Sequence, residues 1–410
     1  MNYLKEYADD RKLPILDKQT FNRLTDEYGK EKFREDLSEY ISTVRPEFPL
    51  HKITKEEVRK SFLDLQSKDI WSYVKPVEQL DRNVKEKYDD YKYNFEKYGI
   101  GLIDAPNIYN VISNYFHQEL RMYCSSYSYK GPLDTWYNGN AKDIWRTLGA
   151  LWRGVNSSGD LSDASYREAI RLGTYIATQF KPNVAKTIYQ MTGAKKVLDT
   201  SCGWGDRLAG FFTSDAEEYI GCDPNPNTYK KYMQQIEMYN SFLTKPKKVT
   251  IYRCGAENLP WEKIRDIDCA FTSPPYFSTE EYNKGGENEQ DQSWYKFNEY
   301  EKWRDDFYLP VAKNSFNSLS DTGHLFVNIM DPQIKNKRYR SCDELVDSLI
   351  NNFVGQIGMR IMQRPKSDKL FESEEEKKEF RNRYFIENIW CFSKDKDFDY
   401  FRHSRRATLF

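Results

Sequence analysis

The chain has 410 residues, with 62 Lys and Arg against 63 Asp and Glu, so its formal net charge is -1. This balance gives no global basic signal for nucleic-acid binding, although enzymes that act on DNA can rely on local basic patches. No apolar run reaches the ~18 residues that a membrane-spanning helix needs. The seven cysteines and four histidines are scattered, which argues against a disulfide framework or a zinc site. We therefore expect a cytoplasmic protein of two or three domains, without metal and without a membrane segment.

The first 160 residues are charged and aromatic and show helical patterning. Phe33–Ile41 and Lys85–Tyr98 are two examples, and the signals for strands are weak there. Tyr123–Asn140 is rich in Ser, Tyr and Gly, which predicts a loop. We predict a mainly helical domain over residues 1–160.

From about residue 195 the pattern changes to apolar strands that alternate with helices. Such alternation is typical of a mostly parallel sheet covered on both faces, and it predicts an α/β, Rossmann-like domain over residues 161–396. The last two strands are separated by a charged loop, so an antiparallel pair and a mixed sheet edge are expected. Residues 397–410 form a basic C-terminal tail. The predicted strands are Lys196–Asp199, Glu218–Cys222, Lys248–Cys254, Ile267–Phe271, His324–Met330, Ile357–Gln363 and Ile386–Ser393.

A glycine turn follows the first of these strands. Asp199 is followed by Gly203 and Gly205, and Asp223 ends the next strand. The glycines allow a sharp turn and close approach of a ligand, and an acid at the second position suits a ribose diol. Leu208 stands where a dinucleotide-binding turn has its third glycine, and Asp199 would repel a pyrophosphate. The pattern therefore favours a cationic ligand without phosphate, such as S-adenosylmethionine, over a dinucleotide. The alternative is a purely structural turn.

The fourth predicted strand leads into Ser273-Pro274-Pro275-Tyr276. Two prolines fix the backbone and donate no hydrogen bond, so they stiffen the chain at the edge where open α/β sheets bind ligands. Such a cleft presents oxygen acceptors to an amino group and an aromatic face to a flat ring. Taken alone, the four residues would more simply be a proline loop that ends a strand.

Together these motifs resemble those of class I S-adenosylmethionine-dependent DNA amino-methyltransferases. That family carries D-x-x-x-G-x-G after the first strand, an acid after the second and (D/N/S)PPY after the fourth, and all three occur here in this order. The resemblance covers about residues 175 to 395. It further implies that Lys181 and Pro182, before the glycine turn, and Glu257, after the third strand, bind the cofactor.

The resemblance implies methyl transfer to an exocyclic amine of a DNA base. The Ser273 hydroxyl and the Pro274 carbonyl would hold the amine, next to Pro275, and Tyr276 would stack on a base flipped out of duplex DNA. Serine at 273 favours cytosine N4, because the adenine enzymes of the family mostly carry Asp or Asn there. The order of the motifs is that of many adenine enzymes, so cytosine is only the preferred of two targets.

Two other functions stay open at this point. One is a methyltransferase of the same fold that acts on RNA, a nucleotide or another planar amine. The other is a catalytically silent nucleic-acid-binding protein, although the intact motifs argue against it. By elimination the region 1–160 would recognise the target, and its alternative role is dimerisation or packing. The basic stretches Lys335–Arg340 and Arg402–Arg406 would be either DNA contacts or solvated surface.

Overall fold

The computed structural model describes residues 2–127, 129–153, 156, 158–362 and 370–402. The chain forms two compact units, each assembled from three segments. The helical unit comprises residues 1–53, 118–178 and 280–284, and the sheet unit comprises residues 54–117, 179–279 and 285–410. The division therefore differs from the predicted boundary at residue 160, because residues 54–117 belong with the sheet.

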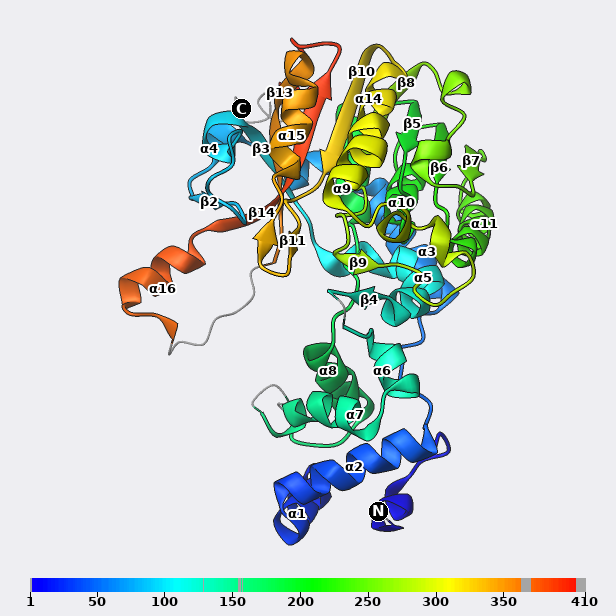
Figure 1. The fold of residues 1–410 in the computed structure, drawn as a ribbon, viewed down its shortest axis with the longest axis vertical. Helices are drawn as coiled ribbons and strands as arrows, with labels where there is room; N and C mark the ends of the chain where they lie inside the picture. The colour runs from blue at the N-terminus through cyan, green and yellow to red at the C-terminus, as the bar shows by residue number, and fades with distance from the viewer. Residues whose placement is uncertain (1, 128, 154–155, 157, 363–369, 403–410) are drawn as a thin grey trace. The chain divides into compact units, whose positions relative to one another are not determined.

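The described residues of the sheet unit form a ten-stranded sheet (Figure 1). Five neighbouring strands, in the order β7-β6-β5-β8-β10, run parallel. Counted along the chain, their order is 3-2-1-4-5, which is the order of a Rossmann fold. The predicted α/β, Rossmann-like fold is confirmed. The bounds are β5 (Lys196–Asp199), β6 (Glu218–Cys222), β7 (Lys248–Tyr252), β8 (Ile267–Thr272) and β10 (Leu319–Asn328).

The predicted mixed edge is also present. β14 (Tyr384–Ser393) runs antiparallel to both β10 and β13 (Phe353–Arg360). The charged stretch between these two strands is not only a loop, because α16 (Glu374–Arg381) lies within it; residues 363–369 are outside the described part.

Residues 54–117 extend this edge with strands that the sequence did not reveal. β3 (Gly99–Asp104) pairs in parallel with β13, and β1 (Val74–Pro76) pairs with β3. The predicted helix over Lys85–Tyr98 is wrong, since only α4 (Phe95–Tyr98) is helical and β2 (Val84–Lys85) pairs with β14. The two glycines of β3 weaken its strand signal, and the strand forms because its apolar residues are buried against the sheet.

A buried lysine ties the first helix of this region to the sheet unit. Lys186, on α9 (Pro182–Met191), donates to the carbonyl oxygens of Leu65, Gln66 and Lys68 at 2.6, 3.0 and 2.7 Å, at the end of α3 (Lys55–Ser67). Burial lowers the pKa of its ammonium to about 8. A cation at a helix C-terminus satisfies carbonyls that have no partner within the helix, so α3 belongs to the sheet unit.

Helices cover both faces of the sheet, as predicted. On one face Phe271 packs against Tyr189 of α9, with ring centroids 6.2 Å apart. On the other face Leu198, Ala270 and Leu325 share a core with the helices after β8. The remaining helices are α10 (Asp206–Thr213), α11 (Pro226–Ser241), α12 (Ser293–Lys296), α13 (Tyr300–Trp303), α14 (Leu309–Asn317), α15 (Ser341–Ser348) and α5 (Val111–Tyr123), whose second half lies in the helical unit.

The helical unit has its own aromatic core, and the predicted helical character of the N-terminal region is confirmed. Phe33, Leu37, Trp136 and Leu148 are completely buried in it. The predicted loop Tyr123–Asn140 contains a helix and a short strand. The elements are α1 (Lys18–Tyr28), α2 (Lys30–Val44), α6 (Pro132–Asn138), α7 (Ala141–Leu148), α8 (Asp163–Gly173), and the antiparallel pair β4 (Ser125–Ser126) and β9 (Glu280–Glu281).

The start of the C-terminal tail packs on the sheet. Tyr400 and Phe401 are buried, and the Tyr400 hydroxyl and the Ser393 hydroxyl lie 2.9 and 3.0 Å from Nδ1 of His324. Residues 403–410, with most of the predicted basic stretch, lie outside the described residues. In the described part of the chain, no helix is long and apolar enough to cross a membrane.

The buried His324 makes the sheet unit sensitive to acid. Burial lowers its pKa to about 4, whereas an unfolded chain binds this proton near pH 6.5. Between these values the unfolded state holds more protons, so this residue should cost about 3 kcal/mol of stability as the pH falls from 6.5 to 4. Urea unfolding as a function of pH measures this loss. The variant His324→Asn should flatten the slope, and a slope equal to that of the wild type would contradict the assignment.

Candidate functional site

The predicted motifs meet where the strand order of the sheet reverses. β5 has β6 on one side and β8 on the other, and both neighbours run parallel to it. The crossovers leave β5 in opposite directions, so a crevice forms outside the carboxyl ends of β5 and β8. The glycine turn follows β5, and Ser273–Tyr276 follows β8.

Both glycines of the turn have left-handed backbone conformations, with φ of 55° at Gly203 and 72° at Gly205. A side chain at Gly205 would collide with Gln235 of α11, whose amide donates to the Gly205 carbonyl at 2.8 Å. A Cβ at Gly203 would meet only the Ser201 carbonyl oxygen, at 3.7 Å. Gly205 therefore serves packing, whereas the Cα of Gly203 faces open space.

Asp199 is directed into the protein. Its carboxylate is completely buried and accepts from Arg207 Nε at 3.0 Å, Arg207 Nη2 at 3.1 Å and the Tyr219 hydroxyl at 2.7 Å. The Ser201 N–H adds a fourth bond at 3.1 Å. Arg207 also donates to the Ser201 carbonyl. The sequence had suggested a cation-binding carboxylate, and the structure pairs that charge with an arginine from its own chain.

Asp223 lies beside the open glycine and is half-buried. One carboxylate oxygen accepts from the Gly203 N–H at 3.2 Å and the Tyr232 hydroxyl at 3.1 Å. The other accepts from Asn225 N–H at 2.9 Å and Thr228 Oγ1 at 3.0 Å. Burial raises the pKa of Asp223 to about 6, and these hydrogen bonds oppose the rise. The carboxylate is thus held next to Gly203, where an added Cβ would meet only the Ser201 carbonyl oxygen.

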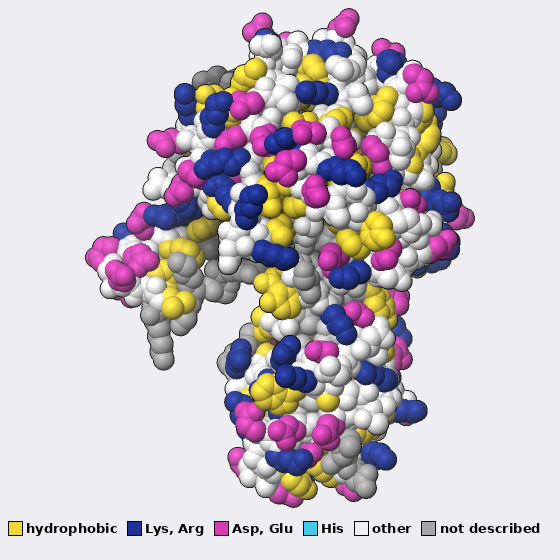
Figure 2. Space-filling view, in the orientation of Figure 1, with side chains coloured by type: hydrophobic (Ala, Val, Ile, Leu, Met, Phe, Trp, Pro, Cys, Tyr) yellow, Lys and Arg dark blue, Asp and Glu magenta, His cyan; other side chains and the backbone are white. Residues whose placement is uncertain are grey.

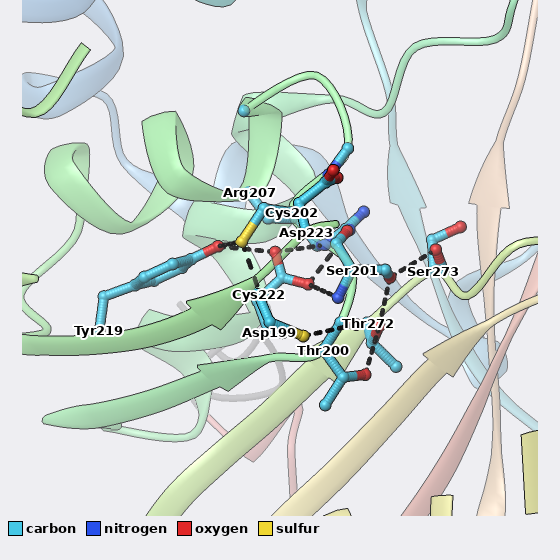
Figure 3. Close-up of polar contacts among 12 residues, drawn as sticks. Asp199, Thr200, Ser201, Cys202, Arg207, Tyr219, Cys222, Asp223, Thr272 and Ser273 are labelled. Atoms are coloured by element: carbon cyan, nitrogen blue, oxygen red, sulfur yellow. Dashed lines mark hydrogen bonds and ion pairs between the residues drawn. The ribbon is translucent and has the colours of Figure 1, made fainter. Parts of the chain in front are cut away.

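A chain of hydroxyls joins the glycine turn to the Ser273 loop (Figure 3). Thr200 Oγ1 donates to Thr272 Oγ1 at 3.0 Å, Thr272 lies 2.7 Å from Ser201 Oγ, and Ser201 Oγ donates to the Ser273 carbonyl at 2.8 Å. A carbonyl oxygen only accepts hydrogen bonds, so Ser201 must donate to Ser273. Thr272 therefore donates to Ser201, and Thr200 donates to Thr272. Sequence reasoning missed Ser201 and Thr272, since their contact spans 71 residues.

The loop itself is anchored at its tyrosine. The Tyr276 hydroxyl donates to the Asn328 carbonyl at 3.2 Å, at the end of β10. Phe277 has a left-handed φ of 53°, which is unfavourable for a bulky residue, and its buried ring contacts Tyr300 and Tyr339 with centroids 5.8 and 5.5 Å apart. Aromatic packing thus holds the backbone in a conformation that it would not adopt alone.

A single π-helical turn packs against Pro274 of the Ser273–Tyr276 loop. Residues Arg304–Tyr308 form this turn between α13 and α14. Pro310 has no N–H to donate, and a π-turn is one way for a helix to absorb a missing bond. Phe307 and Tyr308 line a small, mostly apolar cavity together with Pro274. The other residues around it are Thr200, Thr272, Val311, Ala312 and Val327.

The remaining predicted residues lie around these loops with different surroundings. Pro182 is buried at the first position of α9, a position that suits proline, and Lys181 precedes it. Glu257 forms an ion pair with Lys296 at 2.7 Å and is mostly buried. Its carboxylate folds over Gly255, where a side chain would collide with it.

The predicted basic stretch 335–340 forms a hairpin of β11 (Gln333–Ile334) and β12 (Lys337–Arg338). Arg338 Nε binds the buried Asp331 at 2.8 Å, and Arg340 binds Asp90 at 2.6 Å. These arginines fasten the hairpin to its own unit, and Lys335 and Lys337 are the exposed cations at its tip.

Comparison with known proteins found one family match and several distant structural likenesses. Residues 267–407 match the N6/N4 methyltransferase family model, described as DNA methylase, which confirms the predicted resemblance. A comparison with curated proteins found no match. An rRNA methylase from Streptococcus thermophilus is 10% identical, with TM-score 0.29, over 53% of this chain and 98% of that chain. A putative methyltransferase from Streptococcus mutans in complex with SAH is 12% identical, with TM-score 0.29, over 53% and 99% of the two chains. A putative RNA methyltransferase from Pyrococcus horikoshii is 11% identical, with TM-score 0.29, over 52% and 82%.

The contribution of the buried ion pair between Asp199 and Arg207 to the free energy of unfolding can be tested. Arg207→Met should lower the free energy of unfolding by about 3 to 5 kcal/mol, because it leaves a buried carboxylate without its cation. Urea unfolding measures this change. The double variant Asp199→Leu with Arg207→Met removes both charges and should recover part of the loss. A change in the single variant within about 0.5 kcal/mol, as at an ordinary surface position, would contradict this role.

Proposed function

We propose that this chain, which over residues 267–407 matches the N6/N4 DNA methylase family model, transfers a methyl group from S-adenosylmethionine to an exocyclic amine of a DNA base. Cytosine N4 is the preferred target and adenine N6 the second. The main support is one geometric fact: the hydroxyl chain from Thr200 to Ser273 fixes the glycine turn and the Ser273–Tyr276 loop to each other at the ligand edge of the sheet.

The residues at this edge suit the cofactor. S-adenosylmethionine supplies an electrophilic methyl group on its sulfonium. Gly203 leaves space at its Cα, and the adjacent Asp223 would accept the hydroxyls of a ribose in exchange for present donors such as the Tyr232 hydroxyl, because a carboxylate accepts two such bonds. We assign Asp199 and Gly205 to positioning of the turn, since the contacts of Asp199 are internal and Gly205 packs on Gln235. Contacts of Lys181, Pro182 and Glu257 with the cofactor stay a proposal that rests on the resemblance.

The Ser273 loop would hold the amine. Ser201 already binds the Ser273 carbonyl, so the acceptors proposed for the amine N–H bonds are the Ser273 hydroxyl and the Pro274 carbonyl. Holding both N–H bonds directs the nitrogen lone pair away from its ring conjugation. Pro275 keeps the loop stiff, and Tyr276, fixed through its hydroxyl, offers its ring to the base. Positioning and fixed dipoles then account for the rate, and no covalent nucleophile is needed.

The choice of cytosine rests on Ser273, because Asp or Asn stands at this position in most adenine enzymes of the resembling family. The family match supports DNA as the polymer, and the need to reach an amine inside a duplex supports base flipping. The helical unit is the proposed target-recognition part. RNA, a nucleotide or another planar amine is the alternative substrate, and it is an outcome of the test below.

The test is transfer of labelled methyl groups from S-adenosylmethionine to unmethylated duplex DNA, RNA and free nucleotides. Nucleoside analysis of the labelled product identifies the modified base. We expect N4-methylcytosine in DNA, and label only in RNA or nucleotides would establish the alternative substrate. Calorimetry with the cofactor separates an enzyme from a silent nucleic-acid-binding protein, which would bind DNA without binding the cofactor.

Ser273→Ala and Tyr276→Ala should each lower the transfer rate at least about 100-fold, because each removes a group that orients the amine or the base. Cofactor affinity, measured by calorimetry, should stay within about threefold of the wild type, since neither side chain belongs to the glycine turn. Tyr276→Phe keeps the ring and loses only the anchor to Asn328, so it serves as the matched control. Loss of cofactor binding in both alanine variants would mean that the motif has been assigned to the wrong ligand.

Cofactor binding should also depend on pH through Asp223. Its pKa of about 6 means that the carboxyl is ionised above this pH and neutral below it. An ionised carboxylate accepts hydroxyl hydrogen bonds better, so affinity should fall by up to about tenfold per pH unit below 6. Calorimetry between about pH 5 and pH 8 measures it. Asp223→Asn should bind weakly at every pH, and an unchanged profile in this variant would exclude Asp223 as the titrating group.

A further inference from the structure

Three exposed tyrosines gather on the helical unit, outside its hydrophobic core. Tyr127, Tyr129 and Tyr175 are 45%, 61% and 44% exposed. Tyr175 lies between the other two, with ring centroids 5.4 Å from Tyr127 and 5.2 Å from Tyr129. The rings of Tyr129 and Tyr175 are stacked, with an interplanar angle of 27°. We call these three residues the tyrosine platform.

The backbone under the platform holds one ring outward at a conformational cost. Ser126 and Tyr129 exchange backbone hydrogen bonds of 3.1 and 2.9 Å, which close a tight turn after β4. Tyr127, inside this turn, has a left-handed φ of 51°. Gly or Asn adopts this conformation readily and a large side chain does not. Folding alone would favour a smaller residue here, so the exposed ring calls for another explanation.

The other side of the platform is fixed by side-chain contacts. Tyr175 belongs to the segment after α8, where the N–H and the hydroxyl of Thr178 both donate to Glu280 of β9 at 3.0 Å. Arg121 of α5 donates to the Ala177 carbonyl at 3.0 Å. In the chain, β9 follows Tyr276 after only three residues. Hydrogen bonds therefore join the segment that carries Tyr175 to α5 and to β9, which itself pairs with β4 beside Tyr127.

Cations neighbour the platform in the sequence. Lys130 follows Tyr129, and Arg171 lies in the last turn of α8, four residues before Tyr175; both are exposed. Burial raises the pKa of the nearby Glu280 carboxyl, and its hydrogen bonds to Tyr282 and Thr178 oppose this rise. Figure 2 shows lysine and arginine side chains interspersed with acidic and hydrophobic ones on the visible face of this unit. A nucleic-acid strand carries both flat bases and negatively charged phosphates. Aromatic rings next to cations are complementary to it, because the rings stack on the bases and the cations attract the phosphates.

We propose that the tyrosine platform binds unpaired bases of the DNA strand. This inference rests on the proposed function and adds a partner surface to it. Aromatic side chains stack on the face of any base. In a duplex the neighbouring base pairs cover these faces, whereas extrusion of a target base leaves its partner and its neighbours uncovered. The platform would stabilise the opened strand, separately from the residues that hold the amine.

The test compares variants that keep or remove the rings. Binding of a fluorescein-labelled oligodeoxythymidylate, followed by anisotropy, should weaken about 5- to 150-fold in Tyr129→Leu and in Tyr175→Leu, the range found when a stacking ring is lost. Tyr129→Phe keeps the ring and should bind within about threefold of the wild type. Tyr28→Leu is the matched control, because Tyr28 is also an exposed tyrosine of this unit, stacked on Tyr3 at the end where α1 lies (Figure 1). It should leave binding unchanged.

The outcomes separate this inference from the proposed function. Wild-type methyl transfer to DNA together with unchanged oligonucleotide binding in both leucine variants would overturn the platform and leave the function standing. Weaker binding in these variants without any transfer by the wild type would do the reverse. Equal losses in Tyr129→Phe and Tyr129→Leu would overturn stacking, as would a change of sedimentation in the leucine variants that reveals a second copy of the chain on this surface. Cofactor affinity should stay the same throughout.

Discussion

One buried carboxylate organises the ligand edge of the sheet. Asp199 ends the central strand β5, and its charge is compensated by Arg207 from the following helix. A buried ion pair persists only when its hydrogen bonds are satisfied, and here Tyr219 and the Ser201 N–H complete the set. The same guanidinium also binds the Ser201 carbonyl. The conformation of the turn is thus fixed by electrostatics before any ligand arrives.

Hydrogen bonds also connect the turn at Ser201 to the loops that follow the neighbouring strands. Its hydroxyl binds the Ser273 carbonyl at the end of β8, and Tyr276 binds Asn328 at the end of β10. Three adjacent strands therefore place their terminal loops in fixed relation. A reaction that depends on holding a poor nucleophile in line gains most from such preorganisation. The strained backbone of Phe277, held by its aromatic neighbours, belongs to the same frame.

The sequence predicted β5 and β6 to the residue, because each is a short apolar run between strong turn signals. It missed β3, where two glycines dilute the pattern, and it assigned a helix to Lys85–Tyr98 from periodicity that the fold overrides. At the site, the motifs correctly brought Gly203, Asp223 and Ser273 to one edge of the sheet. The partners of Asp199 could not be predicted, since a carboxylate in a motif looks the same whether it faces a ligand or an arginine. Contacts between residues as distant as Ser201 and Thr272 exist only once the sheet has formed.

The division of the helical unit into three segments has a consequence for the making of the protein. Its last element, β9, pairs Glu280 with Ser126 of β4, and it is reached only after residues 179–279 of the sheet unit. On the ribosome the β4–β9 pair can close only after that strand has been made. Such nonlocal closure slows folding and prolongs the exposure of apolar surface. Neither unit can be expressed as one continuous stretch of the chain.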